Sequence, residues 1–429
     1  MNTKKCFMVI LTILVGTLSF SCSNNGDDPV MPKTETDTST DTPSDKTEKE
    51  LDNNLRLTQS QLDRVQDANA FSLSLLKKLD ESNEEAASLI VSPLSLVYAL
   101  GMTSEGASGE TLNEITKTLG FAEGDLKGIR SLCSKFMFRI PGVDSKVKLS
   151  VANGVFCNKG RNLEPPFVNL LKENYEAQVA TLDFSDPASV GSINAWCSDK
   201  TEGKIKGFID NLDPSTLLFV ANALYFKASW THPFYSYMTA LQPFMREKAP
   251  AVDVPMMMHE KVKIPYASCE LFQMCEMPYG DGKFSMQFVL PQSDLTLRQL
   301  LRMLTWDKLL YTARDLSDKY NTTLMLPRFT TEADLNLVET LKSLGIKRAF
   351  TTSAELDGIA SSTYISSMKQ KTVINVNEEG TEAASVSGTS HGSYGIETLN
   401  TFIANHPFMY LIKENSTGVV LFIGTYNGD

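Results

Sequence analysis

The chain has 429 residues, of which 42% are hydrophobic and 21% are charged. This composition is ordinary for a soluble globular protein with a sizeable core, and it excludes a collagen, a coiled-coil rod and a polytopic membrane protein. Forty basic and 51 acidic residues give a formal net charge of −11, and no long basic run occurs. We therefore expect no nucleic-acid partner.

Common catalytic and metal-binding motifs are missing from the sequence. The four histidines, His232, His259, His391 and His406, form no HExxH pair, and the seven cysteines form no CxxC pair. Neither a dinucleotide-binding GxGxxG turn nor a GxxxxGK[ST] phosphate loop occurs. We expect no cofactor and no metal site.

The N-terminus reads as a targeting segment. Lys4 and Lys5 precede a mostly apolar stretch from Cys6 to Phe20. That stretch is too short to span a membrane comfortably, so residues 1–21 are predicted to be a signal peptide. The stretch ends at Ser21-Cys22, which resembles a bacterial lipoprotein cleavage site, although Ser19 stands where leucine or valine is usual. We expect a lipid anchor at Cys22, with plain secretion as the alternative.

Residues 22–56 are predicted to be the anchor cysteine followed by a disordered acidic tether. Residues 23–54 contain nine acidic residues, three lysines and no aromatic residue, so they cannot bury enough surface to fold. Asp27 and Asp28 resemble the surface-export signal of some Bacteroidetes lipoproteins, or they belong to a plain solvated linker. We expect an outer-membrane lipoprotein exposed at the cell surface; a periplasmic or secreted protein is the alternative.

Residues 57–429 contain no second low-complexity break, which favours one large domain. Ser92-Pro93 predicts a helix start, and Leu112, Ile115 and Leu119 mark a helical face that ends at Gly120. Strands are predicted at 147–151, 216–226, 284–290, 323–327, 372–376, 408–412 and 419–423. Early helices with later strands indicate an α+β fold. The cysteines that remain after removal of the signal peptide and lipidation of Cys22 do not have the spacing of a disulfide-bonded scaffold. They are therefore expected to be free and buried.

A GxSxG motif at Gly388–Gly392 matches the nucleophile elbow of α/β-hydrolases. That elbow requires a strand before it, a helix after it, and an acid and a histidine downstream. Small polar residues surround Ser390, no helical pattern follows, and only Glu397 and His406 remain downstream. We therefore interpret the motif as part of a small-residue loop.

The segment Val376–Ser390 has an alternating pattern that suits either a loop or a strand. Small residues stand at positions 381, 383, 385, 387 and 389, and these positions would share one face of a strand. Such a loop could enter a sheet without a steric or charge penalty, with Glu382 remaining in solvent. A flexible Ser/Gly linker is the alternative, and the pattern alone does not decide between the two.

The segment NEEGTEAAS at 377–385 resembles the hinge of the serpin family. Further similar blocks follow the family's order: 69–79, 91–115, 151–156, 193–209, 219–234, 326–329, 402–412 and 418–424. The resemblance implies three β-sheets with eight or nine helices, a metastable fold and an exposed reactive-centre loop at about 378–401. The implied partner is a protease, preferably a serine protease, held in a covalent 1:1 complex by a monomeric inhibitor that is not an enzyme.

The resemblance also assigns roles to individual residues. The scissile bond lies sixteen residues after the first hinge glutamate, which implies cleavage at Tyr394-Gly395 by a chymotrypsin-like or elastase-like enzyme. Trp230 matches the tryptophan of the breach, where insertion begins. The matching hinge residues are Glu378, Glu379, Gly380, Thr381, Glu382, Ala383, Ala384 and Ser385, and the matching shutter residues behind the main sheet are Ser92, Ser95, Asn222 and Gln370.

The resemblance leads to two further expectations, about Gln370 and Thr381. Gln370 stands where the family usually has a histidine, and its amide can still donate and accept hydrogen bonds. Thr381 should enter the sheet first, with its hydroxyl finding a partner near the shutter end. The alternative function is that of a non-inhibitory serpin, which acts as a binding, carrier or chaperone-like protein.

Overall fold

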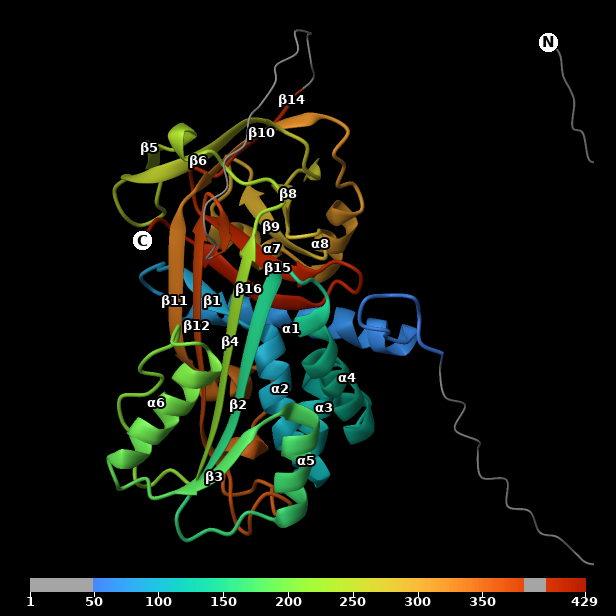
Figure 1. Ribbon diagram of the computed structural model, residues 1–429, viewed down its shortest axis with the longest axis vertical. Helices are drawn as coiled ribbons and strands as arrows, with labels where there is room; N and C mark the ends of the chain where they lie inside the picture. The colour runs from blue at the N-terminus through green and yellow to red at the C-terminus, as the bar shows by residue number, and fades with distance from the viewer. Residues whose placement is uncertain (1–48, 382–398) are drawn as a thin grey trace, which may run out of the picture. The chain divides into compact units, whose positions relative to one another are not determined.

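The computed structural model describes residues 49–381 and 399–429. Within these residues the chain forms nine α-helices and three β-sheets, which confirms the α+β prediction (Figure 1). The helices are α1 (Gln59–Glu81), α2 (Pro93–Ser104), α3 (Gly109–Thr118), α4 (Leu126–Arg139), α5 (Pro165–Tyr175), α6 (Ala188–Lys200), α7 (Leu297–Met303), α8 (Trp306–Ala313) and α9 (Val338–Leu344). None of the described helices is long and apolar enough to cross a membrane.

Sheet A has the strand order β11-β12-β13-β4-β2-β3. Its strands are β11 (Phe329–Asn336), β12 (Ile365–Asn377), β13 (Gly380–Thr381), β4 (Leu218–Ser229), β2 (Val147–Asn158) and β3 (Gln178–Leu182). The strands predicted at 147–151, 216–226 and 372–376 lie within or overlap β2, β4 and β12, respectively. The near-continuous apolar run at 216–226 becomes β4, which is central in the sheet and almost wholly buried.

Two other sheets complete the described fold. Sheet B has the order β1-β16-β15-β9-β8-β7 and sheet C the order β14-β10-β6-β5. The strands of sheet B are β1 (Leu89–Val91), β16 (Val420–Tyr426), β15 (Phe408–Glu414), β9 (Phe284–Pro291), β8 (Phe272–Tyr279) and β7 (Tyr266–Ser268). Those of sheet C are β14 (Leu399–Ile403), β10 (Asn321–Pro327), β6 (Val252–Val262) and β5 (Ala240–Phe244).

The predicted helix boundaries near residue 100 are confirmed. The Ser92 hydroxyl accepts a hydrogen bond from the Ser95 amide, so it caps α2 directly before Pro93. Gly120 follows α3 with a φ of +80°, a conformation that favours glycine and ends the helix. Both boundaries follow from local residue chemistry, which explains why the sequence predicts them.

Two hydrophobic cores cover the two faces of sheet A. The larger core joins α1, α2 and α4 to sheets A and B, and it includes Tyr98, Leu224 and Met368. The smaller core lies between α6 and the opposite face of sheet A, and it includes Phe156, Cys197 and Phe219. Sheet A is therefore held between helices on both faces, and any strand added to it must pass between these two cores.

The last residues of the segment predicted to be a tether pack against the folded domain. Leu55 is fully buried, although it lies within the segment predicted to be a tether. The Lys135 ammonium of α4 donates to the Arg56 carbonyl at 2.8 Å, and the Asn54 amide donates to Glu414 at 2.8 Å. Two leucines, Leu55 and Leu57, supply the apolar surface that makes this docking favourable.

Candidate functional site: the hinge, the breach and the shutter

The beginning of the predicted reactive loop lies inside sheet A. Gly380 and Thr381 form β13, which pairs antiparallel with both β12 and β4. Thr381 lies opposite Val376 of β12 and Ala228 of β4, and only 1% of it is exposed. At the other end of the predicted loop, Leu399–Ile403 form β14 at the edge of sheet C. The expected exposed loop is therefore strand at both of its described ends.

Glycine is required at position 380 by the backbone. Gly380 has a φ of +148°, and a Cβ atom there would lie 2.1 Å from the Ala228 carbonyl oxygen. A side chain would collide with β4 at the point where β13 enters the sheet. The hinge glycine therefore permits the close approach of the two strands.

Glu378 is fixed by two side chains around the breach. The Arg328 guanidinium donates to its carboxylate at 3.1 Å, and the Thr239 hydroxyl donates to it at 2.7 Å. Burial alone would raise the pKa of Glu378, but the hydrogen bonds from Arg328 and Thr239 lower this pKa below its usual range. Glu378 is therefore held ionised next to the start of β13.

Backbone hydrogen bonds from the segment after β4 clamp the hinge. The Trp230 amide donates to the Glu379 carbonyl at 2.8 Å, and the Phe234 amide donates to the Glu378 carbonyl at 2.7 Å. The Trp230 indole also donates to the Asn377 carbonyl at 3.0 Å. These contacts place Trp230 at the end of sheet A where the predicted insertion would begin.

The hydroxyl of Thr381 has a partner, but not where the sequence suggested. It lies 2.8 Å from the Tyr279 hydroxyl, and the Tyr279 ring stacks on Trp230 with ring centroids 4.2 Å apart. Tyr279 comes from β8 of sheet B, at the breach end of sheet A rather than the shutter end. The expectation of a partner near the shutter was wrong, because Thr381 pairs with Val376 and Ala228, each six positions along its strand from the shutter residues Gln370 and Asn222.

The shutter is joined by a pair of hydrogen bonds between Gln370 and Ser92. The Ser92 amide donates to the Gln370 side-chain oxygen at 2.7 Å, and the Gln370 side-chain amide donates to the Ser92 carbonyl at 2.9 Å. The Ser92 hydroxyl in turn donates to the Leu421 carbonyl at 2.7 Å. A side-chain amide satisfies both backbone groups at once, so Gln370 ties β12 to the start of α2 and through it to sheet B.

The other predicted shutter residues are buried but only partly paired. Asn222 lies opposite Gln370 across the β4–β12 pairing, and its side-chain amide donates to Asn153 of β2. Among the described residues, the Asn222 side-chain oxygen and the Ser95 hydroxyl have no hydrogen-bond partner. A buried polar atom without a partner costs about 1–3 kcal/mol. These two atoms leave the shutter with unused hydrogen-bonding capacity.

Comparison with known proteins identifies the family to which this geometry belongs. Residues 66–428 match the family model described as Serpin (serine protease inhibitor). The chain is a serpin. Members of this family are not catalysts, so the chain is not an enzyme. The GxSxG motif at Gly388–Gly392 lies outside the described residues.

The similarity to individual serpins extends over most of the chain. It is 33% identical to bovine Serpin B6, covering 85% of this chain and 99% of that protein. It is 32% identical to bovine leukocyte elastase inhibitor, covering 82% of this chain and 96% of that protein. The native crystal structure of the thermophilic serpin Tengpin matches with a TM-score of 0.78 at 27% identity, covering 85% and 93% of the two chains.

Below β13, the sheet of this serpin is closed along the seam between β4 and β12. These two strands pair in parallel from Ile365 to Lys371, and the Leu217 amide donates to the Ser366 hydroxyl at 3.0 Å at the lower end. Any longer insertion must replace these contacts with those of a new strand. The seam below the shutter is therefore what an entering loop must open.

Several predicted residues of the serpin lie outside the described residues. They are Glu382, Ala383, Ala384, Ser385, Tyr394, Gly395 and Cys22. Among the residues that the structure does describe, no three His, Cys, Asp or Glu side chains gather as metal ligands would.

Sequence reasoning missed four residues that hold the site together. They are Asn153, Thr239, Tyr279 and Arg328, which come from β2, the segment before β5, β8 and the link between β10 and β11. All four contact the hinge or shutter only through the tertiary fold. Asn153 and Arg328 stood within the blocks 151–156 and 326–329, which were noted for their resemblance to serpins, and no spacing pattern pointed to the other two.

Proposed function

We propose that the protein inhibits a serine protease of the chymotrypsin-like or elastase-like class by suicide cleavage at Tyr394-Gly395. The observation that carries this proposal is β13, because the first hinge residues already occupy the sheet position that a longer inserted strand would continue. The small residues at alternate positions from 381 to 389 make that continuation sterically acceptable.

The proposed reaction begins as ordinary proteolysis. The hydroxyl oxygen of the protease serine attacks the Tyr394 carbonyl carbon, and the enzyme's own histidine takes the hydroxyl proton and passes it to the leaving nitrogen of Gly395. An ester then joins Tyr394 to the protease, and the chain beginning at Gly395 is released from it. Insertion of the loop now competes with attack of water on that ester.

The register of β13 supports insertion as far as the shutter. Continuing from Thr381, each step along the loop moves one residue back along both β12 and β4, which brings Ser387 opposite Gln370 and Asn222. The separate β4–β12 register also pairs Gln370 with Asn222. Both strands therefore lead to the same position, where Ser387 would share a face with the unpartnered shutter atoms.

The target class follows from Tyr394. An aromatic residue before the scissile bond suits a deep hydrophobic specificity pocket. An elastase-like enzyme would cut instead at a smaller neighbour such as Thr389 or Ser393. The similarity to the leukocyte elastase inhibitor supports a protease target in general without naming one.

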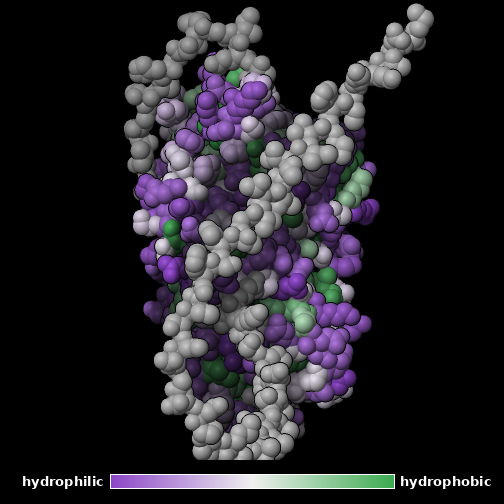
Figure 2. Space-filling model, turned by 90° about the vertical axis from the view of Figure 1, so that its right-hand side faces the viewer, coloured by the Kyte–Doolittle hydropathy of each residue, from purple (hydrophilic) through white to green (hydrophobic). Residues whose placement is uncertain are grey.

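The other parts of the proposal concern assembly and location. We expect a monomer that forms a covalent 1:1 complex with its target and is held on the outer membrane through lipid on Cys22, facing the cell surface. On the face shown in Figure 2, hydrophilic residues predominate and hydrophobic ones occur in small groups. That surface is in keeping with a monomer.

The test is incubation with a panel of serine and cysteine proteases, read on denaturing gels and by mass spectrometry. The expected result is a covalent band of summed mass and a released peptide that begins at Gly395. A peptide that begins elsewhere would move the scissile bond and change the target class. If the loop is cleaved but no protease of the panel gives a covalent band, the result would favour the non-inhibitory alternative.

A further inference from the structure

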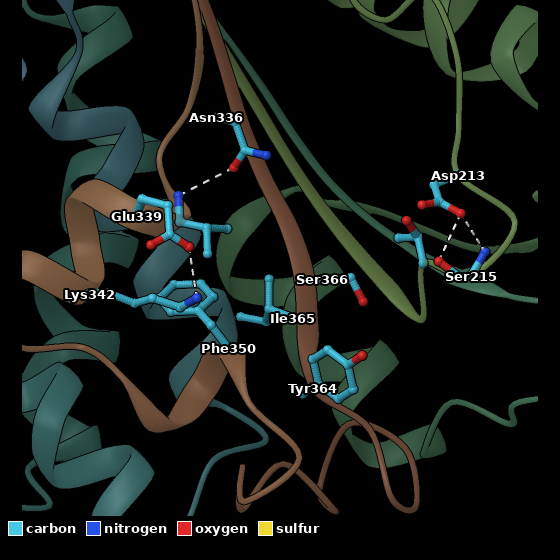
Figure 3. A pocket seen from close by; sticks show the side chains of 11 residues that line it. Asp213, Ser215, Asn336, Glu339, Lys342, Phe350, Tyr364, Ile365 and Ser366 are labelled. Atoms are coloured by element: carbon cyan, nitrogen blue, oxygen red, sulfur yellow. Dashed lines mark hydrogen bonds and ion pairs between the residues drawn. The ribbon is translucent and has the colours of Figure 1, made fainter. Parts of the chain in front are cut away.

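A cavity of about 440 Å³ lies where β4 and β12 begin. Its lining residues come from three segments of the chain, 213–216 before β4, 336–350 around α9, and 364–366 at the start of β12. Figure 3 shows Asp213 and Ser215 on one side of the start of β12 and Lys342 of α9 on the other. One wall of the cavity therefore belongs to β4, and the other belongs to β12 and α9.

The wall before β4 is held in place by its own hydrogen bonds. The Asp213 carboxylate accepts from the Ser215 amide and from the Ser215 hydroxyl, each at 2.8 Å. The Asn158 side-chain amide of β2 donates to the Pro214 and Thr216 carbonyls, each at 2.9 Å. This wall is thus preformed, as in most small-molecule sites.

Several polar groups of the cavity have hydrogen-bonding capacity to spare. The Asn336 side-chain oxygen accepts from the Val338 amide at 3.2 Å, and among the described residues the Asn336 side-chain amide and the Tyr364 hydroxyl have no partner. The Ser366 hydroxyl accepts from the Leu217 amide at 3.0 Å, so its own hydrogen is left to donate. A wholly apolar ligand would leave these groups unpaired, which is costly.

The charges of the cavity disfavour an anion. Two carboxylates, Asp213 and Glu339, face a single amine, Lys342, and Lys342 already pairs with Glu339 at 2.8 Å. Hydrogen bonds from the Ser215 amide and hydroxyl lower the pKa of Asp213, so this carboxylate is ionised at neutral pH. A phosphate or a sulfated ligand would meet a net negative charge.

The remaining lining is apolar. Val338, Phe350 and Ile365 are buried side chains, and the half-buried ring of Tyr364 lies next to Ile365 in the chain. A sugar ring has one face of C–H groups, which packs on such a surface, and a rim of hydroxyls that both donate and accept hydrogen bonds. Pockets of roughly 300–1,000 Å³ hold small ligands, so one or two sugar units suit this volume.

We propose that this cavity binds a neutral saccharide of one or two sugar units, and that it does so only while β4 and β12 are paired. The second part rests on the proposed function. A strand inserted between β4 and β12 would widen the sheet by about 4.8 Å and move the two walls apart. A saccharide that touches both walls would lose one set of contacts, so by linkage its binding opposes insertion.

The direct test measures binding to the intact, full-length protein by saturation-transfer NMR. The probes are four neutral disaccharides: maltose, cellobiose, lactose and N,N′-diacetylchitobiose. We expect binding of at least one, with an affinity that falls about tenfold or more in Tyr364→Ala. Tyr311→Ala is the matched control, because Tyr311 is 65% exposed on α8 and does not line the cavity. Binding of none of the four, or equal binding to wild type and Tyr364→Ala, would overturn the proposal.

A second variant separates a saccharide from a cationic ligand, for which spermidine is the probe. Asp213→Asn removes the charge and keeps an oxygen that can accept from Ser215. It should weaken disaccharide binding less than Tyr364→Ala does. If spermidine alone binds, and Asp213→Asn abolishes that binding, the site takes amines and the saccharide proposal is wrong.

The effect on insertion is measured with a protease that forms the covalent complex. Adding the bound disaccharide should raise the ratio of cleaved protein to covalent complex in the wild type, and this effect should be absent in Tyr364→Ala. An unchanged ratio in the wild type would contradict the link to insertion. If the wild type forms no covalent complex with any protease, the proposed function fails, whereas the binding measurements on the intact protein still decide whether the cavity takes a saccharide.

Discussion

Thr381 shows how much of the hinge depends on a single small side chain. Its backbone pairs with both β12 and β4, its side chain is buried, and its hydroxyl lies against Tyr279. The alternation of small residues predicted that this side chain faces inward. The partner could not be predicted, because Tyr279 lies 102 positions away and belongs to another sheet.

Thr381→Arg should convert the inhibitor into a substrate. Arginine would bury a charge beside Tyr279, which costs several kcal/mol unless the charge is paired. Each ~1.4 kcal/mol added to the insertion barrier slows insertion about tenfold, so hydrolysis of the ester should win. Gels should show cleaved protein without a covalent band, while the initial cleavage rate stays similar.

Thr381→Ser is the matched control, since it keeps the hydroxyl and removes only a methyl group. It should still form the covalent complex. One-to-one trapping of protease by Thr381→Arg would show that inhibition does not depend on hinge insertion.

At the scale of elements, the segment between β4 and β5 links the hinge to sheet C. Phe234 donates its amide to Glu378, and its ring stacks on His259 of β6 with centroids 4.4 Å apart. The His259 ring nitrogen lies 3.2 Å from the His232 carbonyl. A shift of β6 would therefore alter the contacts that this segment makes with the hinge.

Mild acid should destabilise the intact protein through His259. Burial lowers the pKa of His259 below its ordinary value of about 6.5. Between the ordinary and the lowered pKa the unfolded chain binds more protons, so stability is present at higher pH and falls as the pH drops through this window. His259→Gln should make the melting temperature less dependent on pH there. A slope equal to that of the wild type would contradict this role.

The sequence predicts helices and strands better than it predicts the contacts between distant segments. The apolar run of β4, the cap at Ser92 and the stop at Gly120 depend on neighbouring residues, and each is confirmed. The short strand β13 and the docking of Leu55 depend on surfaces made by distant segments, so no local pattern revealed them. The resemblance to serpins located the shutter residues, but it did not predict the hydrogen bond between Asn222 and Asn153.

For the whole molecule, the intact protein should be less heat-stable than the loop-cleaved form. Cleavage would let about fourteen residues form a central strand of roughly 45 Å, at about 3.3 Å per residue. That strand would add two rows of hydrogen bonds to sheet A, and the intact state would then be a kinetic trap. Scanning calorimetry before and after cleavage at 390–396 should show a higher melting temperature for the cleaved protein. Equal melting temperatures would rule out insertion.

Membrane attachment should depend on Cys22, because the predicted lipid on this residue is what would hold the protein there. A single acyl chain binds only marginally and several chains hold firmly. Cys22→Ala should move the protein from the membrane fraction to the soluble fraction and remove the lipid mass. Unchanged membrane association would contradict the anchor.

The burial of Cys197 offers a way to measure when loop insertion occurs. Its sulfur lies in the smaller core under α6, and burial raises the pKa of the thiol to about 12, so it should resist alkylation. The segment after α6 lies over the seam, since Lys371 of β12 donates to the Gly207 carbonyl at 3.2 Å. A strand entering between β4 and β12 widens the sheet by about 4.8 Å and must displace that segment. The rate of alkylation of Cys197 should therefore rise briefly during insertion and fall when the sheet closes again. The time of this rise would give the time of insertion within a single reaction.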